Sequence, residues 1–209
     1  ILTSRWISWR YAILSPEMVF HHGCVWQLLT YMYVHFDLMH TAANMLGLWI
    51  FGPDVERIFG SRRFFAYYTV CGLGAAVTAC VFYPHGEILG ASGAIYGVLL
   101  GFALLFPYRP VYLFGVAPIE ARWLAVMYGV IDLIGGIQAS APGANFDNTA
   151  HFAHLGGLAA GFIVFAIFGK VPLPLFVRRN PPQPSFFSRW VNSMRKKRDV
   201  QRKEQARLT

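Results

Sequence analysis

Residues 90–101 read Gly-Ala-Ser-Gly-Ala-Ile-Tyr-Gly-Val-Leu-Leu-Gly, and residues 153–161 read Ala-His-Leu-Gly-Gly-Leu-Ala-Ala-Gly. Glycines recur every four residues within each stretch, which places them on one face of a helix. Small residues on one face let two membrane helices pack closely. Because Ser92 and His154 each precede a glycine stripe, contact between the two faces would bring both residues to the same end of one helix pair. A serine beside a histidine is the smallest arrangement that can make a hydroxyl group nucleophilic.

The composition indicates a membrane protein with a charged tail. Of the 209 residues, 56% are hydrophobic and 13% are charged, whereas soluble domains carry about 25% charged residues. Residues 1–170 contain eight basic and eight acidic side chains, so residues 171–209 account for the whole net charge of +8. We therefore expect a basic cytoplasmic tail that contacts anionic lipid, and we do not expect a nucleic-acid partner.

Five hydrophobic stretches predict an all-α polytopic membrane protein, folded as a helical bundle. They cover residues 38–58, 64–82, 92–107, 121–137 and 150–168. As a helix, the third measures about 24 Å, less than the ~30 Å hydrocarbon core, so we expect Ser92 below the membrane surface. Residues 1–37 would form an external or interfacial segment with a first loop, in which residues 25–36 suit the membrane interface. A membrane core (38–170) and the basic tail (171–209) would follow.

Basic residues predict the orientation of the five stretches. Arginines lie between the first and second stretches and between the third and fourth, and the tail follows the fifth. If the stretches alternate in direction, all these groups lie on one side, whereas the opposite loops, residues 83–89 and 138–149, contain no Lys or Arg. The positive-inside rule makes the basic side cytoplasmic. Four polar residues then lie near the outer ends of three helices: His40, Asn44, Ser92 and His154.

These outer residues carry the groups that acyl transfer requires. A neutral His154 could take the Ser92 proton during attack and return it to the leaving amine. Asp132 is the one acid within the later stretches; we expect it to lie too deep to contact His154, so we predict a two-residue dyad. The candidate oxyanion donors are the Ser92 amide, free at a helix start, and the side chains of His40 and Asn44 on one helix face.

Tyr96 and the cysteines complete the inventory of candidate groups. Tyr96 lies one turn after Ser92 and could pack its ring against His154, with core packing as the alternative.

The three cysteines form no short-spaced pair and predict neither a disulfide framework nor a zinc site. We therefore expect no metal and no cofactor.

Several motifs together resemble the rhomboid intramembrane serine proteases. They are Gly90-Ala-Ser-Gly with Tyr96 following, His40-Thr-Ala-Ala-Asn44, and Ala153-His154-Leu-Gly-Gly157-Leu-Ala-Ala-Gly161. The resemblance covers about residues 25–168, and each motif stands in the family's order. It implies that Ser92 is the nucleophile and His154 the general base. It assigns oxyanion or supporting roles to five residues: His40, Asn44, Tyr96, His151 and Gly90.

Three points qualify the resemblance. The family usually has Trp-Arg in the first external loop, where this chain has Trp26-Gln27, which puts the anchoring of the loop in question. The family core has six helices, so the five stretches would be helices two to six, with the first expected upstream of Ile1. His151 would hold a water or help to bind the oxyanion, with packing as the alternative.

The resemblance predicts a serine endopeptidase that cleaves transmembrane proteins near the outer surface of a bacterial plasma membrane. Residues 123–137 would then form the gate that admits substrate. The alternative is a non-catalytic rhomboid-like protein that binds membrane segments, although such relatives normally lack the serine or the histidine. A histidine-based metal or proton transporter is a third reading, which the lack of an internal repeat and of a carboxylate-lined path disfavours.

Overall fold

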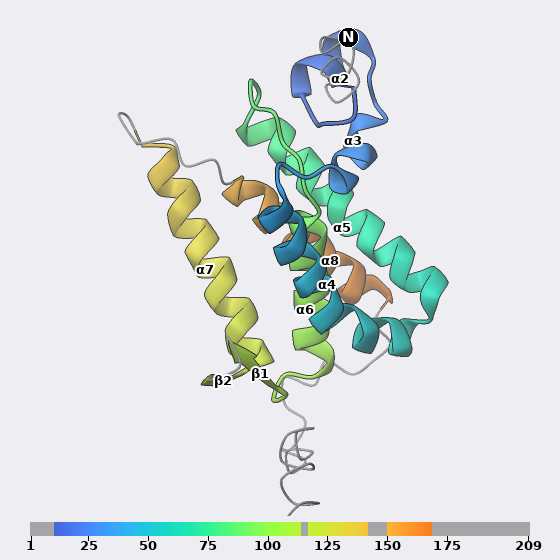
Figure 1. Cartoon of the computed structure of the whole chain (residues 1–209), viewed down its shortest axis with the longest axis vertical. Coiled ribbons are helices and arrows are strands. Elements are labelled where there is room, and N and C mark those ends of the chain that lie inside the picture. Colours follow the sequence, from blue (N-terminus) through green and yellow to red (C-terminus); the bar gives the residue numbers. More distant parts are fainter. Residues whose placement is uncertain (1–10, 114–116, 142–149, 169–209) are drawn as a thin grey trace, which may run out of the picture. The chain divides into compact units, whose positions relative to one another are not determined.

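The computed structural model describes residues 11–113, 117–141 and 150–168 (Figure 1). The predicted basic tail, residues 171–209, lies outside the described residues. The elements in chain order are α2 (Pro16–His22), α3 (Gln27–Thr30), a 3₁₀ turn (Tyr31–Tyr33), α4 (Leu38–Phe59), α5 (Ser61–Phe82), α6 (Ser92–Leu105), β1 (Pro110–Leu113), β2 (Ala117–Glu120), α7 (Ala121–Ala139) and α8 (His151–Phe168).

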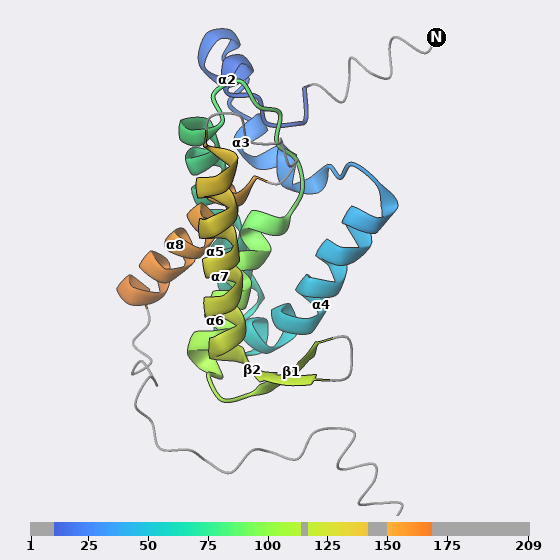
Figure 2. The same ribbon diagram turned by 90° about the vertical axis from the view of Figure 1, so that its left-hand side faces the viewer.

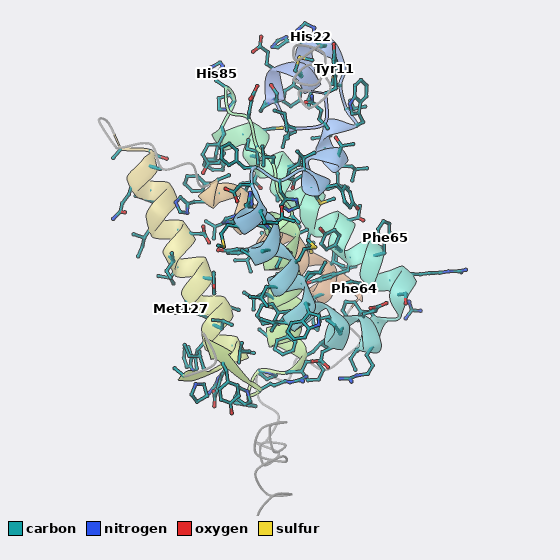
Figure 3. The ribbon with its side chains drawn as sticks, viewed as in Figure 1. Tyr11, His22, Phe64, Phe65, His85 and Met127 are labelled. Carbon is teal, nitrogen blue, oxygen red and sulfur yellow. The ribbon has the colours of Figure 1, made fainter. Side chains whose placement is uncertain are left out.

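The five predicted hydrophobic stretches coincide with α4, α5, α6, α7 and α8, and each boundary agrees within three residues. Among the described residues, α5 is the one helix long and apolar enough to cross a membrane by length and composition. α6 and α8 are strongly apolar but shorter. Large hydrophobic side chains are exposed on the outer faces of the helices, for example Trp49 on α4, Phe65 on α5 (Figure 3) and Ile131 on α7.

α6 is the central helix and contacts α4, α5, α7 and α8 (Figures 1 and 2). Its glycine stripe meets the stripe of α8, as predicted. A Cβ atom at Gly157 would overlap the backbone carbonyl of Gly93, and one at Gly161 would lie 3.1 Å from the Cα atom of Gly97. The two backbones are therefore in direct contact, which only glycine permits at these positions.

The start of α4 is fixed by a side-chain cap. The carboxylate of Asp37 accepts a hydrogen bond of 2.7 Å from the backbone N–H of His40. Such a cap satisfies one of the free N–H groups at a helix start. His40 and Asn44 therefore lie in the first two turns of α4, at the end of the helix where the sequence placed them.

The first loop is anchored without the guanidinium that the family usually has. The Gln27 side chain is fully buried, and its Oε1 accepts a hydrogen bond of 3.1 Å from the backbone N–H of Ser15. Trp26 donates from Nε1 to the carbonyl of Tyr11 at 2.8 Å. The predicted interfacial segment, residues 25–36, contains α3 and the 3₁₀ turn, whereas α2 was not predicted.

The described elements are mostly helical, as the predicted all-α fold requires, and one short antiparallel hairpin joins two of the helices. β1 pairs with β2 between α6 and α7, with Val111 opposite Ile119. The sequence of this segment shows three prolines, which indicated a loop but not its pairing. Arg109, just before β1, forms an ion pair of 2.5 Å with Asp54 of α4 and lies over the ring of Phe102.

Candidate active site

The centre of the candidate site is a direct contact between Ser92 and His154. Ser92 is the first residue of α6, and His154 lies in the first turn of α8. The Ser92 hydroxyl oxygen and the His154 Nε2 atom are 2.8 Å apart, a hydrogen-bond distance. The glycine contact between α6 and α8 explains why residues 62 positions apart meet here.

The structure brings Asp132 into this site. Its Oδ1 atom lies 2.9 Å from the Nδ1 atom of His154, and the Asp132 residue is only 2% exposed. The expectation that Asp132 lies too deep to reach His154 is therefore wrong. Asp132 lies two turns from the end of α7, and His154 lies one turn from the start of α8. The contact therefore shows that the ends of the two helices do not lie at the same level.

His151 contacts the same carboxylate oxygen. Its Nδ1 atom lies 2.7 Å from Asp132 Oδ1, and its side chain is buried. The ring rests against Gly135, where a Cβ atom would come within 2.6 Å of the His151 Nε2 atom. Since Asp132 and Gly135 are three residues apart, they form one face of α7 that receives the histidine rings of α8. This cluster was not predicted, although the spacing of the two histidines was visible in the sequence.

The hydrogen-bond geometry constrains the histidine tautomer. A carboxylate accepts hydrogen bonds only, so with Asp132 ionised the Nδ1 atoms of both His151 and His154 carry the hydrogen. The Nε2 atom of a neutral His154 then has a lone pair that faces the Ser92 hydroxyl. This is the tautomer that a histidine needs to accept a proton from serine.

Tyr96 restrains the His154 ring from one face. Its ring lies parallel to the imidazole, with centroids 4.3 Å apart and an interplanar angle of 15°. Tyr128 of α7 packs edge-on against Tyr96, with centroids 5.5 Å apart. The stack fixes the plane of the imidazole but is compatible with a half-turn flip about the Cβ–Cγ bond, so the hydrogen bonds decide which ring orientation is adopted.

The proposed oxyanion donors lie beside the loop that leads to Ser92. Gly90 has φ of 110°, and a Cβ atom there would lie 2.7 Å from the His40 ring. Gly90 therefore allows the ring to pack directly on the backbone before Ser92. Asn44 is 5% exposed, and its Nδ2 atom donates to the His40 carbonyl at 2.9 Å. The Ser92 N–H belongs to the first turn of α6, where intrahelical partners are missing.

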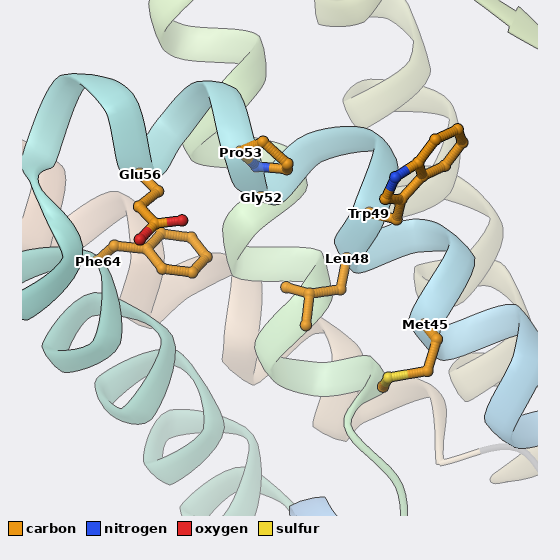
Figure 4. A pocket seen from close by; sticks show the side chains of 7 residues that line it. All are labelled: Met45, Leu48, Trp49, Gly52, Pro53, Glu56 and Phe64. Carbon is orange, nitrogen blue, oxygen red and sulfur yellow. The ribbon is translucent and has the colours of Figure 1, made fainter.

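A groove between α4 and the first turn of α5 contains none of the residues of this cluster (Figure 4). It is lined by Met45, Leu48, Trp49, Gly52, Pro53, Glu56 and Phe64. None of these side chains is a serine, cysteine or histidine, so the groove offers neither a nucleophile nor an imidazole base.

Comparison with known proteins gives a consistent result. Residues 22–171 match the model of the rhomboid domain. The chain is 34% identical over 154 residues to the rhomboid protease GluP of Bacillus subtilis, which covers 74% of this chain and 28% of that protein. It is 33% identical over 171 residues to RHOMBOID-like protein 1 of Arabidopsis thaliana, covering 81% and 41% of the two chains.

A mitochondrial relative matches over a similar region. Rhomboid protein 1 of Saccharomyces cerevisiae is 31% identical over 136 residues, which cover 62% of this chain and 38% of that protein. The chain thus spans less than half the length of each of these three curated relatives. Members of this family are integral membrane proteins. The matched region contains every residue of the cluster described above, and the chain belongs to the rhomboid family.

Proposed function

We propose that the chain is an intramembrane serine endopeptidase in which Ser92 is the nucleophile and His154 the general base. The observation that carries the proposal is the 2.8 Å contact between Ser92 Oγ and His154 Nε2 at one end of the α6–α8 pair. Family membership supports the same activity, because two of the matched relatives are a rhomboid protease and a mitochondrial rhomboid protein.

The reaction would proceed as acyl transfer in two halves. Ser92 Oγ attacks the carbonyl carbon of the scissile peptide bond, and its proton passes to His154 Nε2. The tetrahedral intermediate collapses as the C–N bond breaks, and the imidazolium gives its proton to the leaving amine. Water then attacks the acyl-enzyme ester, again with His154 as base, and the proton returns to Ser92.

The negative oxygen of each tetrahedral intermediate would be stabilised beside Gly90. The proposed donors are the Ser92 N–H, the His40 ring and the Asn44 amide, and the closeness of the last two side chains to Gly90 supports this role. Removal of one such donor typically costs about 10²–10³-fold in kcat. Asn44 presently donates to a carbonyl of its own helix, so its side chain would rotate toward the intermediate.

The membrane arrangement follows from the apolar surfaces and the basic residues. We propose that all five long helices span the bilayer, that residues 38–170 form the membrane core, and that the arginine-bearing ends are cytoplasmic. Ser92 and His154 would then act near the outer surface on transmembrane proteins. The proposed membrane is a bacterial plasma membrane, and the proposed partner of the tail is anionic lipid.

Helix α7 would form the gate for substrate. Among the described elements it makes extensive contacts with α6, α8 and the hairpin, but not with α4 or α5. One side of the helix therefore exposes apolar side chains, including Trp123 and Ile134. A transmembrane substrate could enter along this side with little repacking of the α5–α6–α8 core.

The test is cleavage of a model transmembrane substrate by the purified full chain in liposomes. Ser92→Ala should reduce kcat by at least about 10³-fold, since only oxyanion binding and proximity remain. Ser61→Ala is the matched control. Ser61 also begins a helix, but its side chain is exposed and belongs to α5, which carries none of the proposed site residues. Cleavage by the Ser92→Ala variant at the unmodified rate would refute the assignment.

Two other readings are outcomes of the same experiment. A non-catalytic protein that binds membrane segments would retain its substrate in pull-down assays but cleave nothing in either form. A metal transporter would bind a stoichiometric ion. Within residues 11–113, 117–141 and 150–168, no group of three or more histidine, cysteine or acidic side chains is arranged to hold a metal ion.

A further inference from the structure

Asp132 is an unusual residue for its position. It is an acid with 2% exposure on a helix whose neighbouring residues, Ile131 and Leu133, are exposed apolar side chains. A buried carboxylate in an apolar environment is costly unless charged or polar groups compensate it. The groups that compensate the Asp132 carboxylate are the imidazoles of His151 and His154.

We infer that Asp132 is the positioning residue that holds His154 in its active tautomer and orientation, and that His151 fixes the carboxylate in place. The inference rests on the proposed function, because it concerns the orientation of the same base. It extends the Ser92–His154 pair to a Ser–His–Asp arrangement.

The two nitrogens of His154 contact Ser92 and Asp132 on opposite sides of the ring. Ser92 Oγ lies 2.8 Å from the Nε2 atom of His154, and Asp132 Oδ1 lies 2.9 Å from the Nδ1 atom of the same ring. Since the Nδ1 hydrogen must point to the carboxylate, Nε2 is left to accept the serine proton. Rotation of the ring by half a turn would break both hydrogen bonds.

Among the described residues, Tyr96 supplies the other restraint on the His154 ring. Its ring lies parallel to His154 and restrains tilting, but a parallel stack is equally compatible with an imidazole flipped by half a turn, in which carbon atoms would face Ser92 and Asp132. The hydrogen bond to Asp132 distinguishes the two ring orientations. The stack and the carboxylate therefore supply complementary restraints on the same ring.

The Asp132 carboxylate is itself held in place by a second histidine. His151 binds the same Oδ1 atom at 2.7 Å from one turn earlier on α8. Gly135 removes the side chain that would otherwise block the His151 ring. Two imidazoles on one oxygen fix the position of that oxygen relative to the helix that carries the base.

Asp132 would act without taking a proton. When the Ser92 proton moves to Nε2, His154 becomes an imidazolium, and the ionised carboxylate stabilises its positive charge through the Nδ1–H bond. The proton leaves again from Nε2 to the amine, so Asp132 is unchanged at the end of each half-reaction. Because α7 carries Asp132, displacement of that helix would separate the carboxylate from the base.

The experiment measures kcat and KM separately for variants of the full chain in liposomes. Asp132→Asn and Asp132→Ala should lower kcat by about 10²–10⁴-fold, with KM changed by less than about threefold, because the residue affects the chemical step rather than substrate binding. Asp132→Glu should recover part of the loss, since it restores a carboxylate. Gln138→Ala, a change of an exposed polar residue on the same helix, is the control and should leave both constants unchanged.

A spectroscopic measurement decides the case in which an Asp132 variant fails to fold. In the unmodified chain labelled with ¹⁵N-histidine, the nitrogen resonances of His154, assigned by their loss in His154→Gln, should report hydrogen on Nδ1 and a strongly deshielded Nδ1–H proton. The same signals should persist in Ser92→Ala. Hydrogen on Nε2 in the unmodified chain would overturn the inference.

The outcomes separate the inference from the proposed function. If Ser92→Ala is inactive while Asp132→Ala and Asp132→Asn keep kcat within about threefold of the unmodified value, the dyad stands and the positioning role is wrong. If Ser92→Ala remains active, the proposed function itself fails. If the Asp132 variants lose activity through KM alone, the residue acts in substrate binding and the inference is again overturned.

Discussion

Replacement of Gly161 by alanine tests whether the α6–α8 glycine contact sets the Ser92–His154 distance. A Cβ atom at this position would lie 3.1 Å from Gly97 Cα and 2.8 Å from the Tyr67 hydroxyl oxygen. Ordinary carbon contacts are about 3.5–4.0 Å, so α8 must move away from α6 by roughly 0.4–0.9 Å. The Gly97 atom belongs to the backbone and cannot rotate away.

The expected cost follows from this displacement. Overpacking typically destabilises by about 1–3 kcal/mol, against which the better helix propensity of alanine returns about 1 kcal/mol. The Ser92–His154 contact starts at 2.8 Å and would lengthen beyond good hydrogen-bond distance. A misplacement of about 1 Å can cost 10²-fold in rate, so we expect kcat to fall by about 10–10²-fold.

The matched control is Gly129→Ala on α7. The Cβ atom at Gly129 would lie 3.5 Å from a methyl carbon of Leu158, which is ordinary contact. Because Gly129 lies in the proposed gate, the comparison uses kcat at saturating substrate; this variant should keep the unmodified kcat and unfold at the same or a slightly higher temperature. Cleavage kinetics and thermal unfolding in detergent are measured for both variants. If Gly161→Ala matches Gly129→Ala in both, the helix contact does not set the catalytic distance.

Three further predictions follow from the neighbouring contacts. Tyr96→Ala should lower kcat about tenfold in the cleavage assay, as expected for the loss of an aromatic contact of about 1.4 kcal/mol. Tyr96→Phe keeps the stack, so its kcat should stay within about threefold of the unmodified value. Equal losses in the two variants would contradict the role of the ring. Gly90→Ala places a residue with a Cβ atom at a backbone φ of 110° and brings that atom against the His40 ring. The variant should therefore have a lower midpoint of thermal unfolding and a lower kcat. A fully active and stable variant would contradict this packing. Burial lowers the pKa of His35, and the nearby His40 lowers that pKa further. The unfolded chain therefore binds the proton more readily, so the free energy of unfolding should fall as the pH drops below about 6.5. His35→Gln should lose less thermal stability than the unmodified chain between about pH 7.5 and 5.5, and an identical loss would contradict the assignment.

The sequence predicted the helices and the Ser92–His154 contact for the same physical reason. Apolar stretches set the helix boundaries, and the glycine stripes identified which two faces could meet. Gly90 was predicted only as a supporting residue, and its positive φ explains the support: the bare backbone there makes room for His40. The local pattern of small and apolar residues therefore carried most of the information about the core.

The Asp132 contact could not be read from the same pattern. Depth was judged from the distance of each residue to the end of its own helix, but the ends of α7 and α8 do not lie at the same level, so Asp132 at two turns meets His154 at one turn. The rotation of α7 that turns Asp132 and Gly135 toward α8 depends on packing between helices, which hydrophobicity alone does not specify. An acid in an apolar stretch was the available signal, and its correct partner was a residue 22 positions away.

The hairpin and the first loop show a second limit. β1 and β2 have four residues each and pair only with one another, so neither strand has a strong pattern of its own. Gln27 anchors the first loop by accepting a hydrogen bond from the backbone N–H of Ser15. This contact joins residues twelve positions apart, and the residue types alone do not indicate it.

The most direct test of the central claim is covalent labelling of Ser92 in the folded chain. A fluorophosphonate probe requires an activated serine, and mass spectrometry of the digested protein identifies the modified residue. The account predicts one adduct on the peptide containing Ser92, strongly reduced in His154→Ala and absent in Ser92→Ala, in parallel with loss of substrate cleavage. An adduct on another residue, or unreduced cleavage in the Ser92→Ala variant, would contradict it.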